Sequence, residues 1–150
     1  MKDFYLFINS LDSFDYFDAN KAGHFYVKLN QPICLQERGW HVGLCEINGI
    51  SWDVEPYDTV YVLTNLSNGL LLATNSEGLL RAISIQNDRS TYNEYAHVLY
   101  TPIQTHFIDV IEIQLKVNNF DRELISKTGG SSKNMFKPST WCVLHFKQLL

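Results

Sequence analysis

The chain has 150 residues, of which 45% are hydrophobic and 19% charged, and this composition excludes a disordered protein. The length suits one domain with a core of its own, so we expect a single domain over residues 1–150. The net charge of −4 argues against a phosphate-binding surface, which needs clustered Lys and Arg. We therefore do not expect the domain as a whole to bind nucleic acid.

The first predicted strand, residues 3–9, is apolar on both faces. Phe4 and Ile8 share one face with Leu6, and Tyr5 and Phe7 share the other. Side chains of a strand alternate between its two faces, and one face of an antiparallel sheet is commonly wet. The second apolar face is therefore either covered or a contact surface, which makes Tyr5 and Phe7 candidate interface residues.

Residues 10–23 form a polar and acidic predicted loop that contains three aromatic residues, Phe14, Tyr16 and Phe17. Three aromatic side chains in one loop rarely all stay in water. Either they plug the open end of the domain, or they cross to a neighbouring subunit, where buried aromatics often dominate the binding energy. All three are candidate interface residues on the second interpretation.

The clearest alternation lies between residues 25 and 47. Phe25 and Val27 fall on one side of an extended chain, which continues as a second apolar piece at 32–35. The polar stretch 36–39 then turns the chain into a strand with Val42 and Leu44 on one face. A period of two predicts strands with one buried face.

The rest of the chain repeats this pattern. Strands are predicted at residues 59–64, 70–73, 79–85, 108–117 and 142–146, with an extended segment at 95–103 that Pro102 interrupts. Loops are predicted at 48–58, 86–94 and 126–139, with a hairpin turn at 68–69. No segment shows an apolar stripe of helical period. We expect an all-β, antiparallel sandwich or closed barrel of eight to ten short strands.

The last predicted strand places Cys142 inward and His145 and Lys147 outward. The three cysteines are Cys34, Cys45 and Cys142, an odd number without a CxxC spacing. We interpret all three as small buried hydrophobic residues in a reducing compartment, with one disulfide pair as the alternative.

No pattern in the sequence indicates catalysis. The five histidines lack a metal-ligand spacing, and neither a nucleophile motif nor a phosphate-binding loop occurs. Asp12, Asp15 and Asp18 lack the Gly and Glu of a calcium loop, so we interpret them as a solvated acidic loop, with bound calcium as the alternative. We expect no catalytic residues, no metal site and no cofactor. The lysines around Gly129 are interpreted as a solvated loop, with a nucleic-acid contact as the alternative.

No stretch approaches the roughly 20 apolar residues that cross a bilayer, and the N-terminus lacks the apolar run of a signal peptide. We therefore expect no membrane insertion.

An ordered set of segments resembles one viral family. The set comprises Asn20, residues 24–29, Pro32-Ile33, Trp40 to Ile47, residues 59–62, Leu79-Leu80-Arg81, Tyr100 to Ile103, residues 108–115 and Val143 to Lys147. In this order the segments are similar to the strands of the penton-type minor capsid proteins of Polinton/Maverick elements and adintovirus-like viruses. The resemblance covers most of the chain. One departure is the connection at residues 48–58, which is usually much longer in that family.

The resemblance implies a single jelly roll of about eight strands that forms a homopentamer at a capsid vertex. It also implies the major capsid protein as a neighbour, a place in the virion and assembly inside the host cell. The alternative is a jelly-roll binding module for a receptor or a carbohydrate, with Tyr16 and Trp52 in its site. An enzyme is the third and least supported class.

The predicted register can be tested at Leu44. Leu44→Asp would place an unpaired charge in the core, at a cost of several kcal/mol against a total stability of about 5–15 kcal/mol. We expect this variant not to fold, as measured by circular dichroism and chemical denaturation. A soluble Leu44→Asp protein that unfolds cooperatively would contradict the register.

Overall fold

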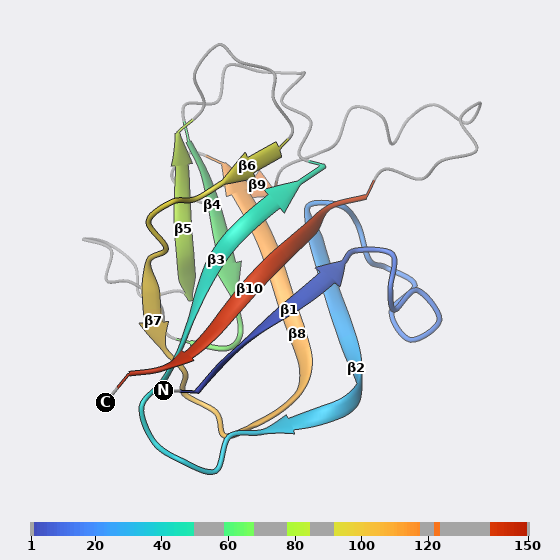
Figure 1. Ribbon diagram of the computed structural model, residues 1–150. Coiled ribbons are helices and arrows are strands. Elements are labelled where there is room, and N and C mark those ends of the chain that lie inside the picture. Colours follow the sequence, from blue (N-terminus) through green and yellow to red (C-terminus); the bar gives the residue numbers. More distant parts are fainter. Residues whose placement is uncertain are drawn as a thin grey trace, which may run out of the picture.

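The computed structural model describes residues 2–49, 59–67, 78–84, 92–117, 122–123 and 139–149. Ten strands and no helix occur in these ranges (Figure 1). The strands are β1 (Asp3–Asn9), β2 (His24–Cys34), β3 (Trp40–Asn48), β4 (Thr59–Thr64), β5 (Leu79–Ser84), β6 (Tyr92–Glu94), β7 (Tyr100–Pro102), β8 (Phe107–Val117), β9 (Arg122–Glu123) and β10 (Trp141–Gln148).

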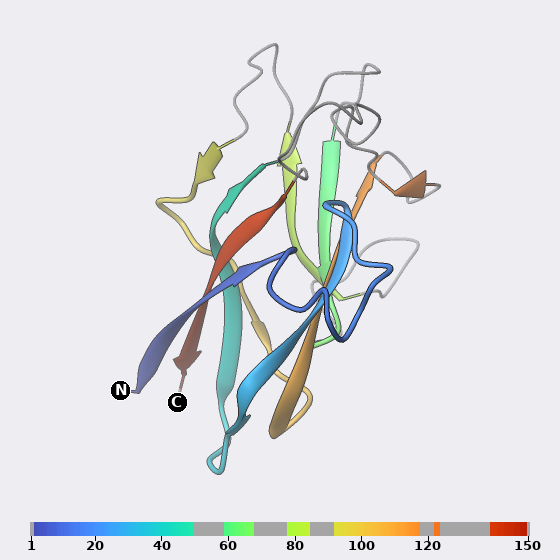
Figure 2. The same ribbon diagram turned by 90° about the vertical axis from the view of Figure 1, so that its right-hand side faces the viewer.

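The strands form two antiparallel sheets. Sheet A has the order β1-β10-β3, and both β6 and β7 pair with the remaining edge of β3. Sheet B has the order β2-β8-β4-β5, with β9 beside β8. The two sheets lie as two layers, seen from the side in Figure 2. The predicted all-β antiparallel sandwich is confirmed.

The core lies between the sheets and consists of the inward side chains of both. Phe25 of sheet B and Phe146 of sheet A are the largest side chains fully removed from water. The buried cluster also includes Ile8, Val27, Val42, Leu44, Ile47, Val60, Val62, Leu80, Ile108, Ile111, Ile113, Leu115, Cys142 and Leu144. These residues fall at alternate positions of their strands, with shifts at β-bulges, so the period-two interpretation is correct for β1, β2, β3, β8 and β10.

Residues 10–23 form a loop, as predicted, and this loop takes the place of a strand beside β2. The Asn20 side chain accepts the Tyr26 backbone N–H at 2.9 Å and donates to the Tyr26 carbonyl at 2.8 Å. The Ser13 hydroxyl accepts the Lys28 backbone N–H at 2.8 Å. Side chains of a loop thus satisfy the outward backbone groups of an edge strand, which protects that edge.

Several predicted boundaries differ from the structure. β2 runs unbroken through Pro32, because β2 is an edge strand, and its pairing with β8 is irregular between Lys28 and Ile33. The stretch 36–39 carries the chain from β2 in sheet B to β3 in sheet A.

Two further predictions for the second half are corrected. Residues 92–94, expected in a loop, form β6 against Glu46–Asn48. Within the predicted extended segment 95–103, only the three residues of β7 form a strand. The expected elements at 68–69, 70–73 and 126–138 lie outside the described residues.

The cysteines do not all lie in the core. All three are free, but only Cys142 is buried, while Cys45 is half-buried and Cys34 is exposed. Cys34 alternates with Ile33 and Leu35, which turn inward, so its own side chain faces water. Burial raises the pKa of the Cys142 thiol and, less strongly, that of Cys45, where the Glu46 carboxylate adds to the shift.

Gly43 in β3 allows a close approach of the chain at residues 98–100. A Cβ atom added at Gly43 would lie 2.7 Å from the Leu99 carbonyl oxygen and would overlap the Val98 side chain. Gly43→Ala should therefore lower the free energy of unfolding by about 1–3 kcal/mol through overpacking. Urea denaturation measures the effect, and Ser84→Ala, at an exposed strand position, is the control. Equal stability of Gly43→Ala and wild type would contradict the packing described.

Candidate assembly surface

The outer face of sheet A carries a row of aromatic rings. The strand registers place Tyr5 opposite His145, His145 opposite Gly43, and Gly43 opposite Tyr100. Because Gly43 has no side chain, the ring of Tyr100 reaches across β3 to His145. Residues from β1, β10 and β7, which are far apart in the sequence, thereby form one surface.

His145 lies at the centre of this row. Its ring stacks on Tyr5 with a centroid separation of 4.2 Å and an interplanar angle of 6°, and Tyr100 meets it edge-on at 5.6 Å. The Nε2 atom lies 2.9 Å from the Asp3 carboxylate, and the Nδ1 atom lies 2.7 Å from the Tyr100 hydroxyl. A carboxylate only accepts hydrogen bonds, so Nε2 donates to Asp3, and in the tautomer with its proton on Nε2 the Nδ1 atom accepts the Tyr100 O–H.

His145 lies on the outer face of its strand, as predicted. The side chain is on the outer face of the sheet, but it is 8% exposed because Tyr5 and Tyr100 cover it. Burial raises the pKa of the Tyr100 phenol, with smaller contributions from Cys45, Tyr5 and Asp3.

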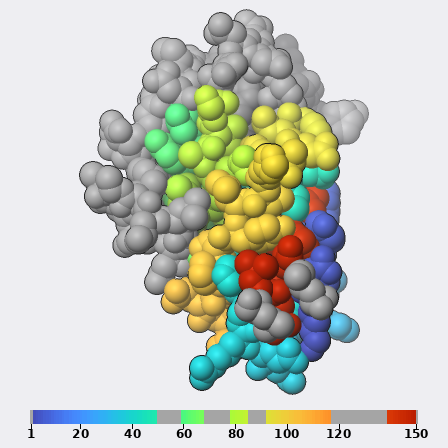
Figure 3. All heavy atoms as spheres, turned by 60° about the vertical axis from the view of Figure 1, so that its left-hand side comes forward, coloured from blue at the N-terminus to red at the C-terminus, as the bar shows by residue number. Residues whose placement is uncertain are grey.

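A second aromatic group continues toward the other end of β1. The ring of Phe7 lies 5.2 Å from that of Trp141, and Trp141 lies 6.0 Å from Tyr92 of β6. Together, Tyr5, Phe7, Tyr92, Tyr100, Trp141 and His145 form what we call the aromatic face. Figure 3 shows β1 (blue), β10 (red) and the segment with β6 and β7 (yellow to orange) side by side around it.

The aromatic face is only partly covered. Tyr5 is 64% exposed, Phe7 57% and Tyr92 41%. Exposed aromatic side chains grouped in this way mark a contact surface more often than an ordinary wet surface. The sequence left open whether the outer face of β1 is covered or is a contact surface. In the described part of the chain, Tyr5 and Phe7 on this face remain exposed.

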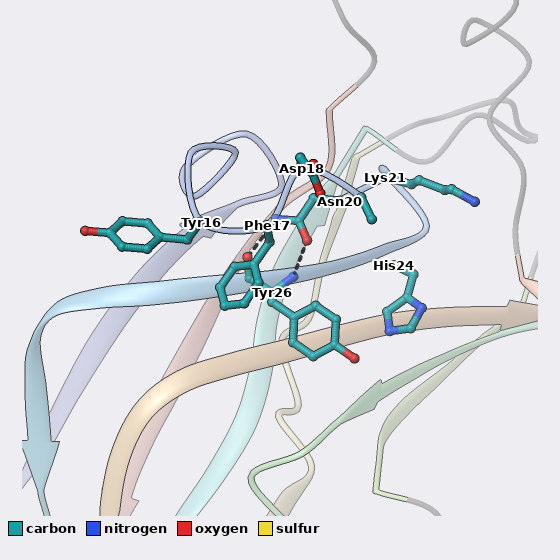
Figure 4. A pocket seen from close by; sticks show the side chains of 8 residues that line it. Tyr16, Phe17, Asp18, Asn20, Lys21, His24 and Tyr26 are labelled. Atoms are coloured by element: carbon teal, nitrogen blue, oxygen red, sulfur yellow. Dashed lines mark hydrogen bonds between the residues drawn. The ribbon is translucent and has the colours of Figure 1, made fainter.

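The three aromatic residues of the loop at 10–23 separate into different environments. Phe17 packs against Tyr26 with the ring centroids 5.4 Å apart, as Figure 4 shows, and Phe14 is half-buried. Tyr16 points away from the strand and is 72% exposed (Figure 4). Phe17 thus contacts its own domain, and Tyr16 is available to another molecule.

Two shallow pockets flank this loop. The first, of about 420 Å³, is lined by Phe17, Asp18, His24 and Tyr26 among others (Figure 4). His24 is held there by a 2.9 Å contact from Nε2 to the Glu112 carboxylate. The second, of about 450 Å³, lies between β1 and β2.

Of the aromatic face, the sequence analysis singles out Tyr5 and Phe7, and their role as interface residues stays a prediction, as does that of Tyr16 in the loop. Trp141, Tyr92 and Tyr100 come from three strands whose order in the sheet the alternation does not reveal.

Comparison of the chain with protein-family models, with curated proteins and with solved structures finds no match. Within the described ranges, no group of three or more His, Cys, Asp or Glu side chains is placed to hold a metal ion. Among the same residues, no helix has the length and hydrophobicity to cross a membrane.

The role of His145 can be tested by substitution. His145→Ala removes the hydrogen bonds to Asp3 and Tyr100 and the ring on which Tyr5 stacks, so the free energy of unfolding should fall by about 1–3 kcal/mol. Ser84→Ala, at an exposed strand position of sheet B, is the control and should change it by less than about 0.5 kcal/mol. Thermal and urea denaturation give both values. Similar losses for the two variants would show that His145 has no special role.

Proposed function

We propose that this chain is a structural subunit of a viral capsid, a single jelly roll that assembles with copies of itself into a closed homopentamer at the vertex. The major capsid protein is then its neighbour in the virion, and the particle assembles inside the host cell. The resemblance of the ordered strand segments supports this proposal, and so do two features of the structure.

The first feature is the order of the strands. The pairs β1–β10, β2–β8, β3 with β6 and β7, and β4–β5 are nested one inside the other and alternate between the sheets. If β6 and β7 count as one interrupted strand, and β9 as an addition, eight strands remain in two sheets of four. Nesting of this kind is what a jelly roll built of two Greek keys requires, so the strand order supports that topology.

The second feature carries the proposal: apart from Phe107, the exposed aromatic side chains of the described residues lie at two separate places. A closed ring formed by rotation needs two different, complementary patches on each subunit, so that each copy offers one patch to each neighbour. The aromatic face supplies one patch through Tyr5 and Phe7, and Tyr16 supplies the other. In the proposed ring, Tyr16 of one copy packs against the aromatic face of the next copy, as buried aromatic anchors do in other interfaces.

A second candidate function is a carbohydrate-binding module. The pocket beside Phe17 and Tyr26 favours it, because it combines aromatic rings with the polar side chains of Asp18 and Lys21. The two functions differ in what Tyr16 does. In the ring it is a contact between subunits, and in the module it borders a sugar site.

The oligomer tests the proposal. We expect light scattering at high protein concentration to give about five times the 17.3 kDa of one chain. Phe7→Asp and Tyr16→Asp should each yield monomers, because losing a central aromatic anchor costs about 2–4 kcal/mol, or at least about thirty-fold in affinity.

Phe107→Asp is the matched control, since Phe107 is also 57% exposed but lies outside both patches. A wild-type protein that remains monomeric and does not associate with capsid particles would overturn the proposal. Saturable glycan binding that Tyr16→Ala abolishes, without an oligomer, would favour the module instead.

A further inference from the structure

One edge of sheet A has free backbone groups, and the hydrogen bonds identify them. The Gln148 N–H donates to the Lys2 carbonyl at 2.9 Å, and the Ser10 N–H donates to the Thr140 carbonyl at 2.8 Å. Since the register between β1 and β10 has no shift, the even-numbered residues of β1 bond to β10. The odd-numbered residues, Tyr5 and Phe7 among them, point their N–H and C=O groups to the free edge.

The edges of the two sheets on this side of the sandwich differ in how they are protected. On β2, the loop at 10–23 satisfies the outward groups of His24, Tyr26 and Lys28. On β1, the Asn9 N–H donates to the Asp12 carboxylate at 3.0 Å, and no other described residue pairs with this edge. An uncapped edge strand next to a capped one is a template for strand addition.

A groove of about 450 Å³ opens directly beside the free edge, between β1 and β2. Its lining is mixed. The apolar residues are Leu6, Phe7 and Ile8 of β1 and Val27, Leu29 and Ile33 of β2, and the polar residues are Asp12, Lys28, Asn30 and Gln31. A strand added to β1 would turn every second side chain toward this groove. The groove therefore selects apolar side chains at alternate positions of the incoming segment.

Two acidic side chains lie near the ends of the free edge. Asp3, whose side chain is half exposed, marks the start of β1, and Asp12 lies just past its end in the lining of the groove. Lys28, the cation in the lining, forms an ion pair with Asp109. An occupant with a basic residue at each end would complement both carboxylates.

These charges also decide between occupants. The β1 strand of a second copy would bring another Asp3 and no basic residue of its own, and Lys2, just before it, forms an ion pair with Glu37 at 2.7 Å. We propose that the free edge of β1 binds an extended segment of another protein. That segment joins sheet A as an additional strand, places apolar side chains alternately in the groove and carries basic residues at its ends. The inference does not rest on the proposed ring, although Phe7 belongs to the aromatic face and also lines the groove.

A designed peptide tests the site on the full chain. The probe is a fluorescein-labelled peptide of sequence Lys-Val-Thr-Val-Thr-Val-Lys, read by fluorescence anisotropy. We expect saturable binding, weakened about tenfold or more when both Lys residues are replaced by Glu. A peptide of the same composition in the order Lys-Val-Val-Thr-Thr-Val-Lys breaks the alternation and should also bind more weakly.

A pair of variants isolates the backbone contact. Phe7→Pro removes the ring and the outward N–H of Phe7 but leaves the ladder to β10 intact, because that N–H faces the free edge. Phe7→Ala removes the ring alone. Because both variants lack the ring that is proposed to contact the next subunit, we expect both to have the same oligomeric state. Phe7→Ala should bind the probe, and Phe7→Pro should lose it. Should Phe7→Pro fail to fold, hydrogen exchange of Phe7→Ala gives the same information, because its residue 5 and 7 amides should become protected when the probe is added.

Any of three results in the probe experiments would overturn the inference. They are the absence of saturable binding, equal affinities of Phe7→Pro and Phe7→Ala, and amides at positions 5 and 7 that stay unprotected. Self-association that Phe7→Pro blocks and Phe7→Ala does not would assign the edge to a second copy and overturn it too. Pentamers of wild type without probe binding would leave the proposed function intact and remove only this inference.

Discussion

The structure depends on burying two apolar sheet faces against each other. Phe146 of sheet A and Phe25 of sheet B are completely removed from water, and neither sheet alone can hide its inner face. Burial of this kind contributes about 25 cal/mol for each Å² of apolar surface. Because the core fixes which residues face inward, it also fixes which residues are left outside, so the positions of Tyr5, Phe7 and Trp141 on the outer face follow from it.

The two edge strands beside the groove, β1 and β2, are held and protected by different contacts. The loop at 10–23 covers β2 through Ser13 and Asn20, whereas β1 is held through its side chains. Asp3 binds His145, and Tyr5 stacks on it, so β1 is attached to β10 at its outer face as well as by backbone hydrogen bonds. This attachment leaves the far edge of β1 free and keeps the exposed ring of Tyr5 in one orientation.

Local features of the sequence sufficed for much of the fold. The alternation in residues 108–117 and 40–47 identifies strands because inward and outward side chains are neighbours in sequence. Contacts between distant residues leave no such trace: the outward position of His145 follows from the alternation, but its contact with Asp3, 142 positions away, does not. The capping of Tyr26 by Asn20 could not be predicted either, since it depends on the path of a loop. Of the aromatic face, the sequence singles out only Tyr5 and Phe7, because these two lie on the same face of one strand.

The place of β10 between β1 and β3 has a consequence for biosynthesis. Asp3 pairs with Lys147, so β1 has no partner in sheet A until β10 has been translated. Contacts between such distant residues slow folding, and exposed apolar strands favour aggregation while it proceeds. During translation, Tyr5 and Phe7 therefore remain on a strand without a partner in sheet A. A chaperone that binds short aromatic segments would act most effectively at this stage.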